Sequence, residues 1–187
     1  MPLPFETVRL NLRPFQDDDL EPFMAYRSDP LVAQYQGWEA PYPREKAVAF
    51  VEEMKNKQPG RQDDWYQIIV TLKPDWQVIG DVAFHILAED IQQAEIAFTL
   101  ARSFWGYGYA SEAASRLLDY LFGELHLHRV RAICDAENLA SARVLERLGM
   151  RREGAFIENV WFKGKWGSEF LYAILAREWQ ERSANRI

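Results

Sequence analysis

"FTLARSFWGYGYASEAASRLLDYLFGEL", from Phe98 to Leu125, is the stretch that decides how the rest of the sequence is interpreted. Gly106 and Gly108 flank a tyrosine, and apolar residues then recur at helical spacing. Two glycines ahead of a helix let the backbone take a positive φ and approach a ligand without a Cβ in the way. The helix adds its positive end, so loop and helix N–H groups would together bind a pyrophosphate. The glycines alone are equally compatible with an ordinary turn before a helix.

Two other phosphate-binding motifs fit this loop poorly. A mononucleotide P-loop needs Lys and Ser or Thr directly after its last glycine, where Tyr109 and Ala110 stand. A dinucleotide fingerprint would need its third small residue at Ser111 and an acidic residue about twenty positions later, after a second parallel strand. Asp135 comes too late for that role, and the strands before the loop look like an antiparallel meander. The pyrophosphate loop remains the better interpretation.

Length and composition predict one globular domain over residues 1–187. A net charge of −6 argues against general binding to the phosphate backbone of nucleic acids. The single cysteine, Cys134, excludes an internal disulfide framework and a Cys-rich zinc site. His126 and His128 have no third ligand nearby, so no metal site is expected. No signal-peptide pattern and no run of about 18 apolar residues occurs, so we expect a cytoplasmic protein without membrane contact.

Apolar spacing and turn residues predict the order of the elements. In chain order they are a strand at 8–12, helices at 17–29 and 45–57, strands at 65–72, 77–87 and 94–100, a helix from about 109, a strand at 128–135, a helix at 138–150, and two strands within 152–179 joined around 163–167. Asn138 is the predicted N-cap of its helix and Gly149 the C-terminal stop. This order indicates an α+β or mixed α/β fold.

Several separated motifs together resemble a known family. "FWGYGYASEA" at 104–113, preceded by "AEIAFTL" at 94–100 and followed by "NLASARVLERLGM" at 138–150, resembles the Gcn5-related N-acetyltransferase (GNAT) superfamily and its RimJ/RimL-like branch. The similarity covers almost the whole chain, from "VRLNLRPF" to "LYAILAREW". It implies a mixed, mostly antiparallel sheet, flanked by helices and splayed between its fourth and fifth strands. Acetyl-CoA would lie in that V with its pyrophosphate on residues 106–111.

The resemblance also implies which residues contact acetyl-CoA. They lie on the fourth strand, the loop and the two following helices: Phe98, Leu100, Arg102, Gly106, Tyr107, Gly108, Tyr109, Ala110, Ser111, Asn138 and Arg143. Ser103 departs from the superfamily pattern, which has Gln or Arg there, and Arg102 is expected to supply charge instead. Main-chain N–H groups around Phe98 are the expected oxyanion donors. Arg143 is equally compatible with a solvated helix charge.

Glu95 is the predicted general base. It shares a strand face with Ala97 and Thr99 and matches the family's "AEIG" strand, although a solvated strand glutamate is the alternative. Many family members carry a tyrosine seven residues after the helix-capping asparagine to protonate the leaving thiolate, and Leu145 stands there. Ser141 matches the "NxxS" pattern and is predicted to hydrogen-bond the sulfur, unless it is only the third residue of its helix.

The resemblance implies acetyl transfer to a primary amine. A protein N-terminal α-amine is the leading acceptor, because a pKa of about 8 leaves about a tenth of it neutral at pH 7 and demands little of one base. A small amine such as an antibiotic or a polyamine is the alternative, and Leu145 leaves a non-catalytic coenzyme A sensor open. Aromatic residues are expected to wall the acceptor side, or to cover the core or a homodimer face: Trp38, Tyr42, Trp161, Phe162 and Trp166.

Overall fold

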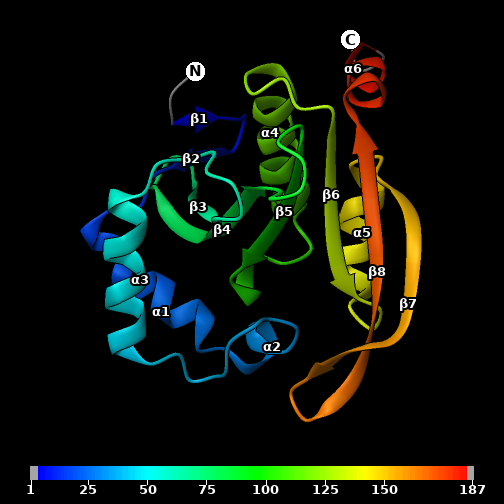
Figure 1. The fold of residues 1–187 in the computed structure, drawn as a ribbon. Coiled ribbons are helices and arrows are strands. Elements are labelled where there is room, and N and C mark those ends of the chain that lie inside the picture. Colours follow the sequence, from blue (N-terminus) through cyan, green and yellow to red (C-terminus); the bar gives the residue numbers. More distant parts are fainter. Residues whose placement is uncertain (1–3, 185–187) are drawn as a thin grey trace.

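The computed structural model describes residues 4–184 and contains one sheet of eight strands. The strands are β1 (Phe5–Glu6), β2 (Leu10–Arg13), β3 (Tyr66–Leu72), β4 (Gln77–Ile86), β5 (Gln93–Leu100), β6 (Arg129–Asp135), β7 (Arg151–Phe162) and β8 (Lys165–Leu175). Their spatial order is β1-β2-β3-β4-β5-β6-β8-β7 (Figure 1). Only β5 and β6 pair in parallel, so the sheet is mixed and mostly antiparallel, as predicted.

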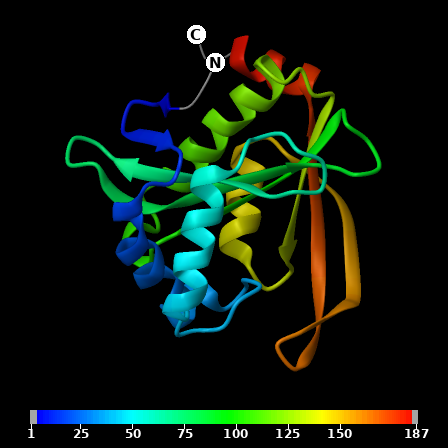
Figure 2. The same cartoon turned by 60° about the vertical axis from the view of Figure 1, so that its left-hand side comes forward.

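Helices cover both faces of this sheet. They are α1 (Leu20–Arg27), α2 (Pro30–Ala33), α3 (Arg44–Asn56), α4 (Tyr109–Gly123), α5 (Leu139–Arg147) and α6 (Ala176–Ala184), with 3₁₀ turns at Asp17–Asp19 and Arg102–Phe104. Figure 2 shows α3 in front of the sheet and α4 and α5 behind it. Two separate apolar clusters correspond to these two layers.

The larger cluster fixes the helix that follows the glycine loop. The apolar stripe of α4 faces the sheet, and Leu117, Leu118 and Leu121 are fully buried against strands that include Phe84. Each fully buried leucine stabilises the fold by about 2 kcal/mol, so the stripe pins α4 in place. The start of α4, and with it the glycine loop, is therefore held at a defined position beside the sheet.

The smaller cluster holds α1 and α3 on the opposite face and contains buried polar groups. The Tyr26 hydroxyl donates to Asp81 Oδ2 at 2.5 Å. Burial raises the pKa of Asp81, and burial together with the Asp81 charge raises the pKa of Tyr26. The Arg27 guanidinium is also buried and lies over four aromatic rings, those of Phe23, Trp38, Tyr42 and Phe50. These contacts fix the segment after α2 against the sheet.

The predicted splay between the fourth and fifth strands is confirmed. These strands are β5 and β6, and their parallel pairing covers only 93–95 with 129–131. Beyond that point β5 continues to pair with β4, and β6 with β8. Figure 1 shows β5 and β6 side by side at one end and diverging toward the other.

The structure corrects the expected elements at both ends. The sequence did not predict β1 or α2. The strand predicted from residue 8 begins at Leu10, and Val8 is 93% exposed outside it. The prediction that the last strand continues to Trp179 is wrong, since β8 ends at Leu175 and α6 follows. Glu178 accepts a hydrogen bond from Leu175 N–H at 2.8 Å, as in half of a capping box, and this contact starts the helix. Trp179 then packs into the core.

Candidate active site

The glycine loop leads directly into α4 and presents main-chain N–H groups at the helix N-terminus. Gly106 and Gly108 have φ values of +85° and +82°, in the left-handed region that favours glycine. The first helical hydrogen bond runs from Glu112 N–H to the Gly108 carbonyl at 3.1 Å, so the N–H groups of residues 109–111 precede it. A Cβ at Gly106 would meet no heavy atom within 4 Å. The loop therefore borders open space.

A buried hydroxyl lies beside these N–H groups. Ser111 Oγ is buried and has no hydrogen-bond partner among residues 4–184. A buried polar group without a partner costs free energy of folding, which a ligand can recover. Tyr107 is 63% exposed and stacks on Tyr109 with ring centroids 5.8 Å apart. The glycines, the N–H groups and this hydroxyl together fit a bound pyrophosphate.

Arg9, which immediately precedes β2 and which sequence reasoning did not single out, contacts the glycine loop. Its Nη1 donates to the Tyr107 carbonyl at 3.0 Å, and its guanidinium lies 4.5 Å from the centroid of the Tyr109 ring. Glu112 accepts from Arg9 Nε at 2.7 Å and from Thr7 Oγ1 at 2.5 Å. Burial opposes the change, but these hydrogen bonds and the Arg9 charge lower the pKa of Glu112. No local pattern links residue 9 to a loop about a hundred positions later.

The main chain of β5 faces the V at alternate residues. Ala101 N–H donates to the Ile79 carbonyl at 2.8 Å, on the β4 side. Because hydrogen-bonded and non-hydrogen-bonded pairs alternate in antiparallel strands, the main-chain groups of Phe98 and Leu100 point away from β4. The Leu100 carbonyl accepts from Trp105 Nε1 at 2.8 Å. The N–H groups of both residues thus face the space that β6 has left.

A cavity of about 170 Å³ lies in this V. Residues of β5, β6, α5 and the β7–β8 hairpin line it, and Phe98, Asn138 and Ser141 are among them. The structure therefore brings the predicted oxyanion donor and the predicted sulfur ligand to one cavity. The glycine loop lies outside this lining, at the N-terminus of α4.

The α5 wall of the cavity has the local structure predicted for it. Asn138 Oδ1 accepts from Ser141 N–H at 3.1 Å, which confirms Asn138 as the N-cap. Gly149 has a φ of +83°, and Met150 N–H donates to the Leu145 carbonyl at 3.1 Å, which confirms the C-terminal stop. Leu145, at the position of the family's tyrosine, is buried and lines the cavity.

Cys134 lines the same cavity from the α5 side of the sheet. Its side chain is 8% exposed. Burial, and then the charges of Asp135, Glu169 and Glu146, raise the pKa of the thiol to about 11. The group is therefore a protonated thiol at neutral pH and a poor nucleophile.

Glu95 lies at the vertex of the V, where β5 and β6 still pair. Its Oε2 accepts from Arg131 Nε at 2.9 Å, and the Glu95 side chain is 16% exposed. It does not line the cavity, whose first β5 residue is Ile96. Alternate residues of a strand share a face, so Glu95 lies on the same face as Ala97 and Thr99, as predicted. In the register with β4, Glu95 lies opposite His85 and Ala97 lies opposite Ala83. Glu95 is therefore next in sequence to the first cavity-lining residue of β5 but is not itself part of the lining.

The two predicted coenzyme arginines lie at the surface. Arg102 Nε donates to Asp29 Oδ2 at 2.7 Å, and the Arg102 side chain is 60% exposed. Arg143 on α5 is exposed and forms no ion pair within residues 4–184. Asp29 also caps α2 by accepting from Leu31 N–H at 2.9 Å. Arg102 therefore joins the glycine loop to α2 rather than standing as a free charge.

A second pocket, of about 320 Å³, adjoins the first through Phe162, which lines both. Trp38, Tyr42 and Trp161, three of the five aromatic residues expected at the acceptor side or on the core or a dimer face, also line it. Trp166 is not part of this lining but packs on Trp161, with ring centroids 5.5 Å apart. An aromatic wall thus leads toward the cavity in the V.

Lys163 closes one side of the second pocket. It lies at the tip of the β7–β8 hairpin, which reaches toward α2 in Figure 1. Its Nζ donates to the Ala33 carbonyl at 2.8 Å and to the Trp38 carbonyl at 2.7 Å. The hairpin is therefore fastened to the segment after α2, far away in the sequence.

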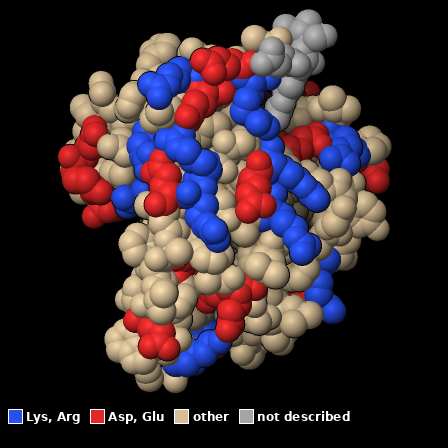
Figure 3. All heavy atoms as spheres, turned by 90° about the vertical axis from the view of Figure 1, so that its right-hand side faces the viewer, with Lys and Arg blue, Asp and Glu red and all other residues tan. Residues whose placement is uncertain are grey.

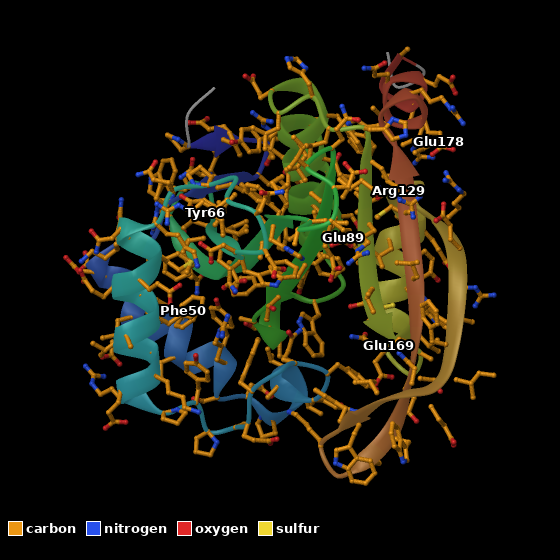
Figure 4. All side chains as sticks on the ribbon, in the orientation of Figure 1. Phe50, Tyr66, Glu89, Arg129, Glu169 and Glu178 are labelled. Carbon is orange, nitrogen blue, oxygen red and sulfur yellow. The ribbon has the colours of Figure 1, made fainter. Side chains whose placement is uncertain are left out.

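Sequence reasoning missed four polar residues that line the first cavity. They are Tyr35, Gln36, Asp135 and Glu169. Figure 4 labels Glu169 on β8, in the part of the sheet where β5 and β6 have diverged. Alternation along β6 and β8 would have given the face of each carboxylate, but only the strand register brings them together.

Charged side chains of both signs are interspersed on the side of the molecule seen in Figure 3. Basic and acidic side chains alternate over the upper half of that face. Arg129 pairs with Glu153, and Arg151 pairs with both Glu153 and Glu178. Within residues 4–184, no group of three His, Cys, Asp or Glu side chains is placed to hold a metal ion. In the same part of the chain, no helix is long and apolar enough to cross a bilayer.

Comparison with known proteins identifies relatives over most of the chain. Residues 9–151 match the family described as acetyltransferase (GNAT) domain. Uncharacterized N-acetyltransferase YnaD of Bacillus subtilis is 36% identical over 173 residues, 92% of this chain and 97% of that protein. An acetyltransferase (GNAT family) structure from Bacillus anthracis has a TM-score of 0.83 at 34% identity, covering 94% of this chain and 100% of that one. Putative ribosomal N-acetyltransferase YdaF of B. subtilis is 36% identical over 57% of this chain and 58% of its own length.

Proposed function

Because the chain belongs to the GNAT acetyltransferase family and is an acetyl-CoA-dependent N-acetyltransferase, we propose that its acceptor is the α-amine of a protein N-terminus. Acetyl-CoA supplies the acetyl thioester. In this proposal, the N–H groups of residues 106–111 and the Ser111 hydroxyl hold the pyrophosphate. Phe98 and Leu100 hold the rest of the coenzyme through their main-chain N–H groups, and Asn138 does so through its amide. Tyr107, Tyr109 and Ala110 shape the loop, while Arg102 and Arg143 supply charge nearby.

The protein's own groups have distinct tasks in the transfer. The Phe98 N–H, which faces the V, stabilises negative charge on the carbonyl oxygen. Ser141 hydrogen-bonds the leaving sulfur from the α5 wall, where Leu145 leaves no other hydroxyl on that face of the helix. Glu95 accepts the proton that the acceptor amine must lose before it attacks the thioester. Its ion pair with Arg131 fixes one carboxylate oxygen and leaves the other to accept that proton.

The aromatic pocket beside the cavity is the observation that carries the choice of acceptor. Trp38, Tyr42 and Trp161 offer flat surfaces on which the first peptide groups of an extended N-terminus can pack. Phe162, shared by both pockets, would lie beside the α-amine. The B. subtilis relative YdaF is named a putative ribosomal N-acetyltransferase, which supports a protein acceptor. A small amine such as spermidine would need little of this surface.

The test is thiol release from acetyl-CoA with peptides that carry a free N-terminal Ala, with the same peptides blocked at the N-terminus, and with spermidine. We expect the free peptides to be the best acceptors and the blocked ones to give no thiol. Preferred turnover of spermidine would replace the protein acceptor by a small amine.

Glu95→Gln tests the proposed base with the same peptides. We expect the rate at neutral pH to fall by about 10²-fold, and part of the loss to be recovered as the pH rises and more amine becomes neutral. Glu89→Gln is the matched control, because Glu89 also lies beside Arg131, at 3.6 Å, but is 66% exposed. A Glu95→Gln enzyme as fast as Glu89→Gln would remove Glu95 from the mechanism.

A further inference from the structure

Two carboxylates face each other at the cavity in the V, and neither has a role in the transfer proposed above. Asp135 of β6 and Glu169 of β8 are directly opposite in the antiparallel register, and both line the cavity. Ala136 N–H donates to the Ser168 carbonyl at 2.8 Å, so the adjoining 135–169 pair is a non-hydrogen-bonded one. Side chains approach each other most closely in such pairs, and like charges there destabilise a sheet.

The protein itself does not neutralise this pair. Asp135 Oδ1 accepts from Glu137 N–H at 2.7 Å, and Glu169 Oε2 accepts from Asn159 Nδ2 at 2.6 Å. Neither carboxylate forms an ion pair with a Lys, Arg or His side chain within residues 4–184. Lys165 of the hairpin pairs with Glu137 at 3.0 Å instead. The two negative charges therefore meet in the cavity without a cation.

The remaining lining of the cavity is mixed in polarity. Cys134 alternates with Asp135 along β6 and so lies on the α5 face, 8% exposed. Its thiol makes no hydrogen bond within the described part of the chain. Polar side chains also line the cavity from other elements, namely Tyr35, Gln36, Asn138 and Ser141. Such a space suits a polar ligand better than core packing.

We propose that Asp135 and Glu169 bind the ammonium form of the acceptor and thereby restrict this transferase to cationic primary amines. The inference rests on the proposed function, because it places the acceptor amine in this cavity. An ammonium ion offers three N–H donors, enough to bind both carboxylates and to offset their repulsion. Phe162 joins this cavity to the aromatic pocket, so the remainder of the acceptor leaves along that wall.

The test measures binding without turnover, on the protein loaded with coenzyme A. Calorimetry with an Ala-initiated hexapeptide amide and with spermidine compares wild type, Glu169→Gln and Asp135→Asn. Both substitutions keep the side-chain shape and the hydrogen-bond acceptor but remove one charge. We expect each to weaken binding of the preferred amine by about tenfold or more, since a charge-assisted hydrogen bond is lost. In thiol-release assays, KM should rise more than kcat falls.

Glu158→Gln is the matched control, because Glu158 of the neighbouring strand β7 is exposed, does not line the cavity and forms no ion pair within residues 4–184. This variant should bind amine as wild type does, and all variants should keep their coenzyme A affinity. Melting temperatures of Glu169→Gln and Asp135→Asn, measured without amine, should equal or exceed that of wild type, since like-charge repulsion is relieved. A purely structural pair would instead lower them.

The outcomes separate this inference from the proposed function. Unchanged amine affinity in both charge-removing variants, or no binding of either amine to wild type, overturns the ammonium site. Amine binding that depends on Asp135 and Glu169 but gives no thiol release supports the site and contradicts the proposed transfer. An arylamine is neutral at pH 7. If the two substitutions weakened its binding as much as that of the cationic amines, the pair would not recognise charge.

Discussion

At the scale of single residues, the positive φ of one glycine restricts which side chains the glycine loop accepts. Gly108 has a φ of +82° and is the N-cap of α4, so any L-residue with a branched Cβ is strained there. A Cβ at this position would lie 3.6 Å from Arg9 Nη2, which is ordinary contact. The protein interior therefore tolerates the side chain, and the constraint comes from the backbone and from whatever approaches it.

Gly108→Val should lower coenzyme A affinity by about tenfold or more while the fold is kept, because the branched side chain shifts the N–H groups and blocks their approach to phosphate. The matched control is Gly60→Val, since Gly60 has a φ of +85° and a Cβ there would meet no heavy atom within 4 Å, but it lies far from the loop in sequence. Calorimetric titration with coenzyme A measures the effect. Equal affinities in the two variants would show that the loop does not hold phosphate.

The contacts of Glu112 with the N-terminal segment make the stability of the protein depend on pH. Hydrogen bonds from Thr7 and Arg9 lower its pKa against the opposing effect of burial. A carboxylate with a lowered folded-state pKa contributes stability above its unfolded pKa of about 4.3, and this stability is lost as the pH falls through the folded pKa. Glu112→Gln should therefore destabilise the protein by about 1–2 kcal/mol at pH 7, and the difference from wild type should shrink at low pH. Urea denaturation at pH 7 and pH 3.5 measures it, and a difference independent of pH would exclude the charge as its origin.

The residues found from the sequence and those missed differ in the range of their interactions. Gly106, Gly108 and Asn138 act within a few positions of their own helices, so turn and capping preferences identify them. Arg9 and the Asp135–Glu169 pair act through contacts between distant strands. Nothing local distinguishes such residues from ordinary surface charges, and the resemblance to a family extends only to positions that its motifs share.

At the scale of elements, caps set where the functional helices begin and end. The Asn138 cap and the Gly149 stop of α5 were predicted because both signals lie in the sequence next to the helix. The β8–α6 boundary was missed because the apolar residues 170–174 continue without a turn signal into Ala176. There the deciding contacts are the Glu178 side chain on Leu175 and the buried Trp179, which a strand pattern does not reveal.

The cap of α5 separates a structural role of Asn138 from a coenzyme role. Asn138→Ala should cost about 1 kcal/mol of stability, because Ser141 N–H loses its acceptor. Asn138→Asp keeps a good cap and should restore that stability. If the amide also contacts coenzyme A, the aspartate variant should still bind it more weakly, since its carboxylate cannot donate a hydrogen bond. Thermal melting and coenzyme titration of both variants decide, and full coenzyme affinity in Asn138→Asp would limit Asn138 to capping.

At the scale of the whole molecule, the separation of β5 from β6 leaves part of β5 without a neighbouring strand on one side. The pairing of β5 with β6 ends at Glu95 and Arg131, and beyond that point the Phe98 and Leu100 N–H groups face the V rather than a neighbouring strand. The sequence predicted this splay through its family resemblance, not from periodicity, because strand patterns do not say where two neighbours part. A long ligand that spans the V and the α4 N-terminus would connect the two halves of the sheet.

Acetyl-CoA should therefore stabilise the whole fold, whereas reduced nicotinamide adenine dinucleotide should not. Both ligands carry a pyrophosphate, but only the pantetheine arm of acetyl-CoA can pair with the main chain of Phe98 and Leu100 along the V. At a hundredfold excess over its dissociation constant, a ligand adds about 2.7 kcal/mol by mass action, which raises the melting temperature of a protein of this size by roughly 5–10 °C.

Scanning calorimetry with each ligand, on wild type and on Gly108→Val, measures the effect. The variant should need a higher acetyl-CoA concentration for the same shift, because its loop is impaired while its V is intact. Equal shifts with both dinucleotide and acetyl-CoA would mean that the loop alone holds the ligand and that the V contributes nothing to its affinity.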